Sequence, residues 1–329
     1  MLYNDSVYGK VNIREKIIMD LMNSRAMQRL KHISQGGPLI FLPSDHAWNK
    51  SKTTRFEHSM GVYILLNKFD ASLEEQIAGL LHDISHTVFS HSLDFLFNRN
   101  IEHDYHENFK EEIILNSEIP SILKKNGIDI KKILNEKKFG LLERKLPDLC
   151  ADRIDYFFRD FKLYTVSEKE FKIMFDALDV FNNEIIFKDK NAARIFAEKY
   201  IQANKLFWCN ALQATIFKLV SDVVKLGLDE NILTKDDLFS TDEIVYNKLK
   251  NSGDNEIIDK IKSISEIKII EDEHDYDLHL KTKVRYTDPK IKINEKIIIL
   301  SKIDKSYEKI MNDFIQRASK GFFIKIIES

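Results

Sequence analysis

Histidine is the residue whose distribution most constrains this chain. The stretch from His58 to His106 is rich in histidine. It also contains the adjacent pair His82-Asp83, directly after the apolar run 77–81. An imidazole and a carboxylate are costly to bury unless something pairs with them, and both are common ligands of divalent transition metals. The pattern therefore predicts a buried metal site. Six of the ten histidines lie in one 49-residue window: His58, His82, His86, His91, His103 and His106.

The spacing within this stretch leaves two interpretations open. Adjacent side chains on a helix point about 100° apart, so His82 and Asp83 reach one ion only if it lies between them or the helix ends there. The following Ile84-Ser85 offers such an end. His82 and His86 are four residues apart and share a helix face, but that spacing also fits ordinary helical neighbours.

Length and composition restrict the class of protein. A chain of 329 residues forms one large domain or two unequal ones. With 43% hydrophobic and 31% charged residues it is not generally disordered, and no apolar run approaches the roughly 20 residues of a membrane-spanning helix. Two cysteines, Cys150 and Cys209, are too few for a disulfide framework, and the N-terminus lacks a secretory signal. We expect a soluble, cytoplasmic protein with no membrane partner.

The charge balance argues against long-range attraction to nucleic acid. Basic and acidic residues number 50 and 52, so any anion must be bound locally. The Lys-rich stretch 124–138 lacks interleaved aromatic residues, which favours a solvated surface, although nucleic acid is not excluded as a partner. The isolated histidines are interpreted as structural. They are His32, His46, His274 and His279, and His103 is interpreted in the same way.

The apolar pattern predicts a mainly α fold. Alternating apolar residues over 7–13 predict a short strand or hairpin, and isoleucine-rich segments after about residue 265 predict further strands. We expect a helical core over residues 1–230 and a smaller α+β lobe over residues 231–329. Helical spacing covers 15–33, 58–69, 73–84, 106–116, 147–162, 192–227 and 303–319.

Several motifs carry a resemblance to a known family. Four of them occur in order: Arg55-Phe56-Glu57-His58-Ser59, Leu81-His82-Asp83-Ile84-Ser85-His86, Phe89-Ser90-His91-Ser92-Leu93-Asp94 and Asp152-Arg153-Ile154-Asp155-Tyr156. This set resembles the HD-domain deoxynucleoside triphosphate triphosphohydrolases, which include the sterile-alpha-motif and HD-domain enzyme and bacterial relatives. The likeness covers residues 3 to 165 well and the remainder loosely. Other similar stretches are Asn4-Asp5 through Gly9, Gln28-Arg29-Leu30, Gln35-Gly36-Gly37 and Arg285-Tyr286-Thr287-Asp288-Pro289.

The resemblance implies an HD-domain core with one divalent metal. Its ligands would be His58, His82, Asp83 and Asp152. Manganese, iron, cobalt, nickel and zinc suit such a donor set, and magnesium suits it less well. An ion there would polarise a phosphoryl oxygen and lower the pKa of a bound water.

The resemblance also implies catalytic histidines. His86, His91 and His106 would line the phosphate path, with Asp94 orienting a histidine. An imidazole with a pKa near 6.5 suits protonation of a leaving oxygen, but the sequence does not decide which of these is the general acid.

Substrate contacts are implied for Arg55, Gln35, Tyr156 and Asp160. Arg55 has an alternative interpretation, as an ion-pair partner of Glu57 or Asp83. Tyr156 is divided between substrate contact and core packing. The neighbouring Phe157 and Phe158 are interpreted as core, and Phe207-Trp208 as core or a subunit contact.

One later helix departs from the family pattern. Where the family places an arginine and a histidine near the phosphates and a tyrosine near the sugar, this chain has Gln202, Leu206 and Asn210. Lys205, or else Lys199, would have to compensate.

The resemblance thus implies hydrolysis of deoxynucleoside triphosphates to deoxynucleoside and triphosphate. The alternatives are a phosphodiesterase, nuclease or nucleotidase acting on another phosphate ester, and a non-catalytic nucleotide-binding regulatory module. A homo-oligomer is suggested by the resemblance alone.

Overall fold

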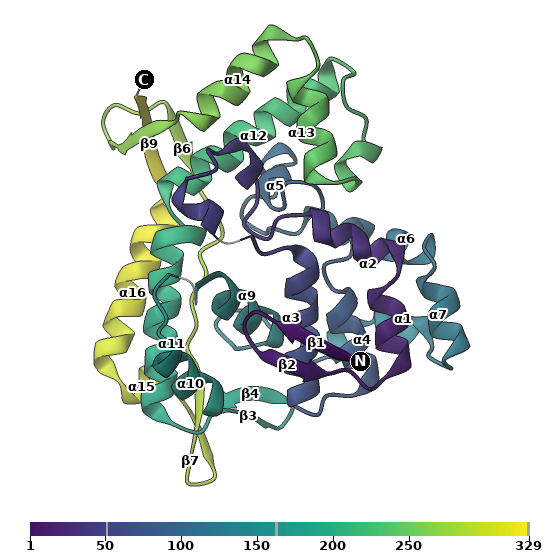
Figure 1. Ribbon diagram of the computed structural model, residues 1–329. Coiled ribbons are helices and arrows are strands. Elements are labelled where there is room, and N and C mark those ends of the chain that lie inside the picture. Colours follow the sequence, from purple (N-terminus) through teal and green to yellow (C-terminus); the bar gives the residue numbers. More distant parts are fainter. Residues whose placement is uncertain (51, 162–163, 328–329) are drawn as a thin grey trace.

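The chain folds into a largely helical body with small peripheral sheets (Figure 1). This computed structural model describes residues 1–50, 52–161 and 164–327. The mainly α prediction is confirmed. Within the described ranges, no helix combines the length and apolar character needed to cross a bilayer.

The helices follow one another from the N-terminal third to the C-terminus. In the first half they are α1 (Lys16–Met22), α2 (Arg25–Arg29), α3 (Arg55–Lys68), α4 (Leu73–Leu81), α5 (Ser92–Leu96), α6 (Lys110–Leu115), α7 (Ile119–Lys125), α8 (Ile130–Leu134) and α9 (Ala151–Phe161). In the second half they are α10 (Glu168–Asp176), α11 (Lys190–Ala203), α12 (Ala211–Asp229), α13 (Asp242–Lys250), α14 (Asn255–Ser265), α15 (Leu300–Ile303) and α16 (Lys305–Lys320). Residue 162, the last of the predicted helix over 147–162, lies outside the described residues.

The strands form three small sheets. β1 (Leu2–Asp5) and β2 (Gly9–Asn12) make an antiparallel hairpin, which begins earlier than the predicted strand over 7–13. β3 (Leu178–Phe181), β4 (Glu184–Phe187), β7 (Lys290–Ile293) and β8 (Lys296–Ile299) lie side by side in that order. In the third sheet β9 (Phe322–Ile327) lies between β5 (Lys268–Glu271) and β6 (Leu278–Leu280).

Local capping explains where two predicted long helices break. The stretch 15–33 divides into α1 and α2 because the Ser24 side chain accepts a hydrogen bond from the Met27 backbone N–H and starts a new helix. The stretch 192–227 divides into α11 and α12 because the Asn210 side chain accepts from the Gln213 N–H. Asn210, at a position where the family places a substrate-binding residue, therefore serves as an N-cap.

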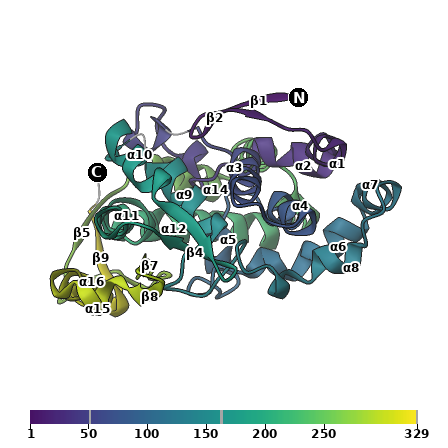
Figure 2. The same ribbon diagram turned by 90° about the horizontal axis from the view of Figure 1, so that it is seen from below.

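Helix α3 lies at the centre of the molecule and contacts α4 and α9. It begins with a capping box in which Thr54 and Glu57 satisfy each other's backbone N–H groups. Gly61 allows α9 to approach closely, since a Cβ at that position would lie 1.9 Å from Asp155 Oδ1. Seen from below, α3 and α9 lie between α7 at one end and the α15–α16 pair at the other (Figure 2).

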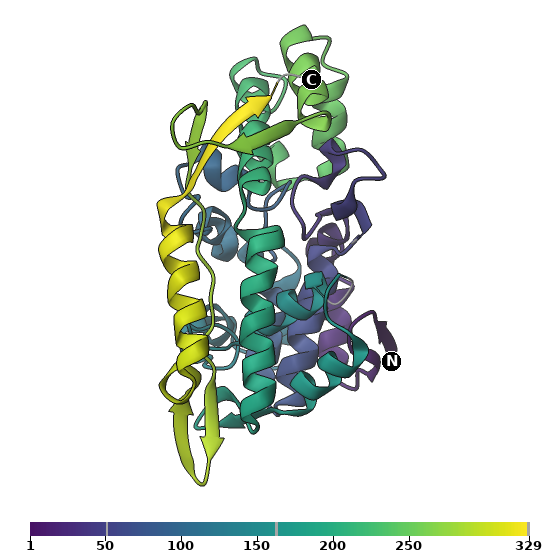
Figure 3. The ribbon, with the colours of Figure 1, turned by 90° about the vertical axis from the view of Figure 1, so that its left-hand side faces the viewer.

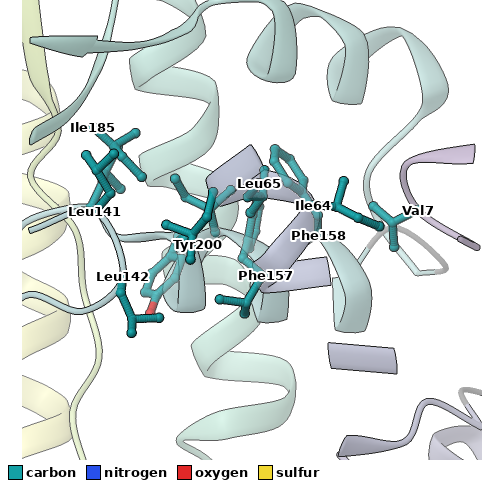
Figure 4. Packing of buried hydrophobic residues seen from close by; sticks show 14 of the residues in the cluster. Val7, Ile64, Leu65, Leu141, Leu142, Phe157, Phe158, Ile185 and Tyr200 are labelled. Carbon is teal, nitrogen blue, oxygen red and sulfur yellow. The ribbon is translucent and has the colours of Figure 1, made fainter. Parts of the chain in front are cut away.

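The main hydrophobic core packs around these central helices. Leu65 of α3, Phe157 and Phe158 of α9 and Tyr200 of α11 gather there (Figure 4). Both phenylalanines are fully buried, which confirms their interpretation as core residues. A second core cluster surrounds α12, and α5 and α14 pack against that helix.

Segments on both sides of residue 230 share structure. β4 pairs in parallel with β7 at Phe187 and Ile291. The C-terminal helix α16 runs beside α11 (Figures 1 and 3). A boundary near residue 230 stays a prediction; one sheet and both core clusters include residues from both sides of it.

Candidate active site

A cavity of about 400 Å³ opens where α3 and α9 meet the segment 82–91. Volumes of this size are typical of small-molecule sites. The cavity lining includes every predicted site residue except Asp94 and Lys205. Asp94 lies directly behind His91, whereas the Lys205 side chain is exposed.

The four predicted metal ligands converge in this cavity. His58 Nε2 lies 3.1 Å from His82 Nε2 and 2.9 Å from Asp152 Oδ1. His82 Nε2 lies 3.4 Å from Asp83 Oδ1 and 3.6 Å from Asp152 Oδ1. Donor atoms around one ion with bonds of about 2.0–2.2 Å have separations of this kind.

Hydrogen bonds at the far side of each imidazole decide which nitrogen faces the cavity. His58 Nδ1 donates to Asp155 Oδ2 (2.7 Å), and His82 Nδ1 donates to the backbone oxygen of Gly79 (2.8 Å). In the neutral rings, both Nε2 lone pairs therefore point toward the same space as the two carboxylates. Lone pairs and carboxylates so close repel one another unless a cation lies between them, so the donor set fits a divalent ion.

The electrostatics of this group favour positive charge. Burial lowers the pKa of His58, but the hydrogen bonds with Asp152 and Asp155 outweigh it and raise the pKa to about 10. Burial raises the pKa of Asp152, and the hydrogen bonds from His58 and His82 outweigh that effect and hold it well below its usual value. The carboxylate stays ionised, ready to share a cation.

A buried ion-pair chain holds His58 in place from behind. Arg159 Nε donates to Asp155 Oδ2 (2.9 Å), and Arg159 Nη2 donates to Asp5 Oδ2 in β1 (3.0 Å). Asp5 in turn accepts from the backbone N–H groups of Val7 and Tyr8. The N-terminal hairpin thus supports the site through Asp155. Sequence analysis named Asp155 only within a motif and assigned it no role, although it lies three residues after Asp152.

The segment that carries His86 and His91 is fixed from two directions. Arg29 Nη2 donates to the backbone oxygens of Ile84 (2.9 Å) and His86 (2.8 Å). Asp242 Oδ1, at the start of α13, accepts from the Phe89 N–H (2.7 Å). These contacts position the histidines without any regular secondary structure.

The histidines form a stacked cluster beside the predicted metal site. His86 stacks on His106 with ring centroids 4.0 Å apart, and His91 lies 4.9 Å from His86. Both ring nitrogens of His86 are buried and, among the described residues, have no hydrogen-bond partner. Burial, Arg55 and His106 all lower the pKa of His86 and of His91 well below the usual value, so both rings are neutral. His91 Nδ1 donates to Asp94 Oδ2 (2.8 Å), which orients the ring.

Arg55 forms an ion pair and also lines the cavity, so its position fits both the ion-pair and the substrate-contact interpretation. Its Nη1 donates to Asp83 Oδ2 (2.8 Å) and its Nε donates to Ser90 Oγ (3.0 Å). It pairs with Asp83 and not with Glu57, which caps α3 instead. The guanidinium still lines the cavity.

Aromatic side chains form another part of the cavity lining, the aromatic wall. The Tyr156 hydroxyl shares a hydrogen bond with the Tyr200 hydroxyl, and Trp208 Nε1 donates to Asp160 Oδ2 (3.0 Å). Burial raises the pKa of Asp160 to about 6. Phe207 and Trp208 pack against the core and also line the cavity. Other apolar and aromatic residues of the lining are Leu39, Trp48, Leu142, Leu146, Tyr164 and Phe217.

The end of α11 and the residues that follow it, 199–206, contribute little positive charge to the cavity. Gln202, Lys205 and Leu206 are exposed and outside its lining, while Lys199 Nζ donates to the backbone oxygen of Thr165 (2.7 Å). Two cations that sequence analysis assigned no role, Lys283 and Arg285, line it instead. The only sequence signal for them was the family-like segment 285–289.

Comparisons with known proteins agree with this geometry. A family model described as HD domain matches residues 55–160. The uncharacterized protein YdhJ of Bacillus subtilis is 37% identical over 331 positions, covering 100% of both chains. The metal-dependent phosphohydrolase cns2 of Cordyceps militaris is 31% identical over 242 residues, covering 70% of this chain and 68% of cns2.

Two further likenesses are more distant. The deoxynucleoside triphosphate triphosphohydrolase SAMHD1 of Danio rerio is 31% identical over 112 residues, 29% of this chain and 17% of that protein. A hypothetical protein of Aquifex aeolicus has a crystal structure similar at a TM-score of 0.71, with 19% identity and coverage of 94% and 93%. The latter shows the shared fold.

The chain therefore belongs to the HD-domain superfamily and is a metal-dependent phosphohydrolase of that class. The predicted family is confirmed.

Proposed function

We propose that this phosphohydrolase converts deoxynucleoside triphosphates to deoxynucleoside and triphosphate. The observation that carries the proposal is the convergence of His58, His82, Asp83 and Asp152 in a cavity that also contains an aromatic wall. The partial likeness to a SAMHD1 named for this activity supports it.

In this proposal, His58, His82, Asp83 and Asp152 hold one divalent transition metal, with manganese as the first choice. When bound, the ion polarises a phosphoryl oxygen and lowers the pKa of water. Arg55 fixes Asp83 by a charge-assisted hydrogen bond and presents its remaining N–H groups to phosphate.

The stacked histidines receive the phosphate chain. His86 offers a buried ring N–H that has no partner among the residues the structure describes and can donate to a phosphoryl oxygen. His91, oriented by Asp94, is the favoured general acid because arriving negative charge favours its protonated form. His106, stacked on His86, completes this side.

The aromatic wall receives the nucleoside. A base has two apolar faces and stacks on rings such as that of Trp48 or Trp208. Tyr156, Asp160 and Gln35 supply polar groups for the sugar and base edge. The Gln35 side-chain oxygen is buried and, within the described residues, has no partner.

The test is product analysis by chromatography. Metal-loaded protein (Mn, Co, Mg and Ni in parallel) is incubated with each deoxynucleoside triphosphate, ribonucleotides and a short single-stranded DNA. We expect deoxynucleoside and intact triphosphate, absent with Asp83→Ala. Release of orthophosphate from monophosphates, or cleavage of cyclic nucleotides or DNA, would contradict deoxynucleoside triphosphates as the substrate. Metal-dependent hydrolysis of a phosphate ester would still stand.

A specific observation favours a second candidate, a nucleotidase or phosphodiesterase acting on a less highly charged ester. A triphosphate carries more negative charge than a monophosphate, so carboxylates near its path oppose binding. Among the described residues, eight carboxyl groups line the cavity against five lysines and arginines: Asp83, Glu102, Asp104, Glu107, Glu136, Glu143, Asp152 and Asp160 against Arg55, Lys110, Arg153, Lys283 and Arg285.

A regulatory module without catalysis is the third alternative. It predicts nucleotide binding with no turnover for any metal or substrate tested. The complete donor set and the Asp94-oriented His91 speak against it.

A further inference from the structure

Among the five described lysines and arginines that line the cavity, two have no carboxylate oxygen within 4.0 Å. Arg55, Lys110 and Arg153 each have a carboxylate oxygen within 4.0 Å: Asp83 at 2.8 Å, Glu107 and Glu136 at 3.0 Å, and Glu143 at 3.5 Å respectively. Within the described ranges, neither Lys283 nor Arg285 forms such an ion pair, and both are half-buried. Positive charge withdrawn from water without a counter-ion is costly, which marks this place as suited to an anion.

The extended segment that carries both cations is held firmly. Asn100 Nδ2 donates to the Lys281 backbone oxygen (2.7 Å), and Thr282 Oγ1 donates to Cys209 Sγ (3.4 Å). Farther along, the Asp288 N–H donates to the Pro147 oxygen (3.1 Å), and the Tyr307 hydroxyl donates to the Thr287 oxygen. Residues 281–289 are thus held along their length, and the side chains of Lys283 and Arg285 both line the cavity.

Contacts with Glu102 and His103 orient the side chains of Lys283 and Arg285. Lys283 Nζ donates to the Glu102 backbone oxygen (2.9 Å), and Arg285 Nη2 donates to His103 Nδ1 (3.1 Å). An arginine only donates, so His103 Nδ1 accepts and the proton of the neutral ring is on Nε2. That Nε2–H is buried, and among the described residues it has no partner.

We propose that Lys283, Arg285 and His103 form a phosphate-binding subsite of the active site, which receives phosphoryl oxygens that do not contact the metal. The proposal rests on the proposed phosphohydrolase site. In this proposal the positive charge for the phosphate comes from the segment 281–289 and not from residues 199–206. Two charged donors and one neutral N–H suit the oxygens of a terminal phosphate in a phosphate chain.

The surroundings of Lys283 are consistent with this role. Burial and the neighbouring Arg285 lower the pKa of Lys283, and an anion bound beside it would raise that pKa again. Burial, His91 and Arg285 likewise lower the pKa of His103 well below its usual value and keep it a neutral donor.

The experiment is calorimetric titration of the full, manganese-loaded chain with inorganic triphosphate and with orthophosphate. The variants are Lys283→Gln and Arg285→Gln, and the matched control is Lys281→Gln, an exposed lysine two residues earlier in the same segment. We expect each of the two variants to weaken triphosphate binding about 10- to 100-fold, as for loss of a charged hydrogen bond, and the control to bind as the wild type does. Arg285→Lys should restore part of the affinity.

Unchanged triphosphate affinity in both variants, or no binding to the wild-type protein, would overturn the subsite. Circular dichroism and metal content identify a variant that fails to fold. Lys283→Gln keeps the test decisive in that case, because it gives up only one contact to a backbone oxygen.

Failure of the proposed function is a separate outcome. If no deoxynucleoside triphosphate is hydrolysed but both variants lose phosphate binding, the substrate proposal fails and the subsite stands. If hydrolysis proceeds and the variants bind triphosphate like the wild type, the subsite alone fails. Equal losses for orthophosphate and triphosphate support the subsite and point to a substrate with one phosphate.

Discussion

The two sides of the cavity are built differently. On the predicted metal side, each imidazole has its second nitrogen fixed, by Asp155 for His58 and by a backbone oxygen for His82. Elsewhere in the lining, Lys283 and Arg285 are aimed by a backbone oxygen and a neutral ring, and within the described residues neither forms an ion pair with a carboxylate. One side is short of positive charge and the other side has it in excess.

A phosphate ester would be oriented by this difference in charge. The carboxylate-rich side requires a cation, and the cationic side requires an anion. A phosphate ester that bridges the two satisfies both needs at once, with His86, His91 and His106 lying between. Substitutions on either side of the cavity test this arrangement.

The largest effect is expected on the metal side. Asp83→Ala removes a predicted ligand and leaves Arg55 without its partner, so metal retention and turnover should both fall below detection. Metal content by elemental analysis and product assays check this. His274→Ala, at an exposed histidine, is the matched control and should retain both. A variant at Asp83 that keeps metal and activity contradicts the site.

Between the two sides, His91→Ala should separate chemistry from metal binding. Turnover is expected to fall about 10²- to 10⁴-fold, the usual contribution of a positioned acid or base, while metal content stays as in the wild type. Steady-state kinetics with the best substrate, together with metal analysis of the same preparation, measure both. Unchanged turnover would remove His91 from the mechanism.

A smaller effect on metal binding is expected at Asp155, which contacts the predicted ligand His58. Asp155→Asn keeps the side-chain shape but weakens the contact that directs His58 Nε2 at the metal. Metal affinity should fall about 10- to 100-fold, and turnover should recover in excess metal. Titration of activity against manganese concentration tests this, and an unaltered titration would show that Asp155 only supports the fold.

The smallest effect is expected at Lys205. Its side chain is exposed and outside the cavity, so Lys205→Ala should leave KM within about twofold of the wild type. Arg285→Gln, measured alongside it, should raise KM clearly. A large rise for Lys205→Ala with none for Arg285→Gln would reverse the assignment of the cationic side.

Sequence reasoning succeeded where the determinants are local. The helical class follows from composition and spacing, and the family follows from four short motifs around His58, His82, His91 and Asp152. It placed helix ends less well, because Ser24 and Asn210 start new helices inside continuous apolar patterns.

The class of chemistry can be inferred from the sequence, because the predicted donors of a metal site are encoded as adjacent or closely spaced residues such as His82-Asp83. Only the tertiary structure decided which nitrogen of each imidazole faces the cavity, since that depends on partners such as Gly79 and Asp155. It alone brought Lys283 onto the segment of Glu102, 181 residues earlier in the chain. Contacts at that separation arise from packing, which no local pattern of residues records.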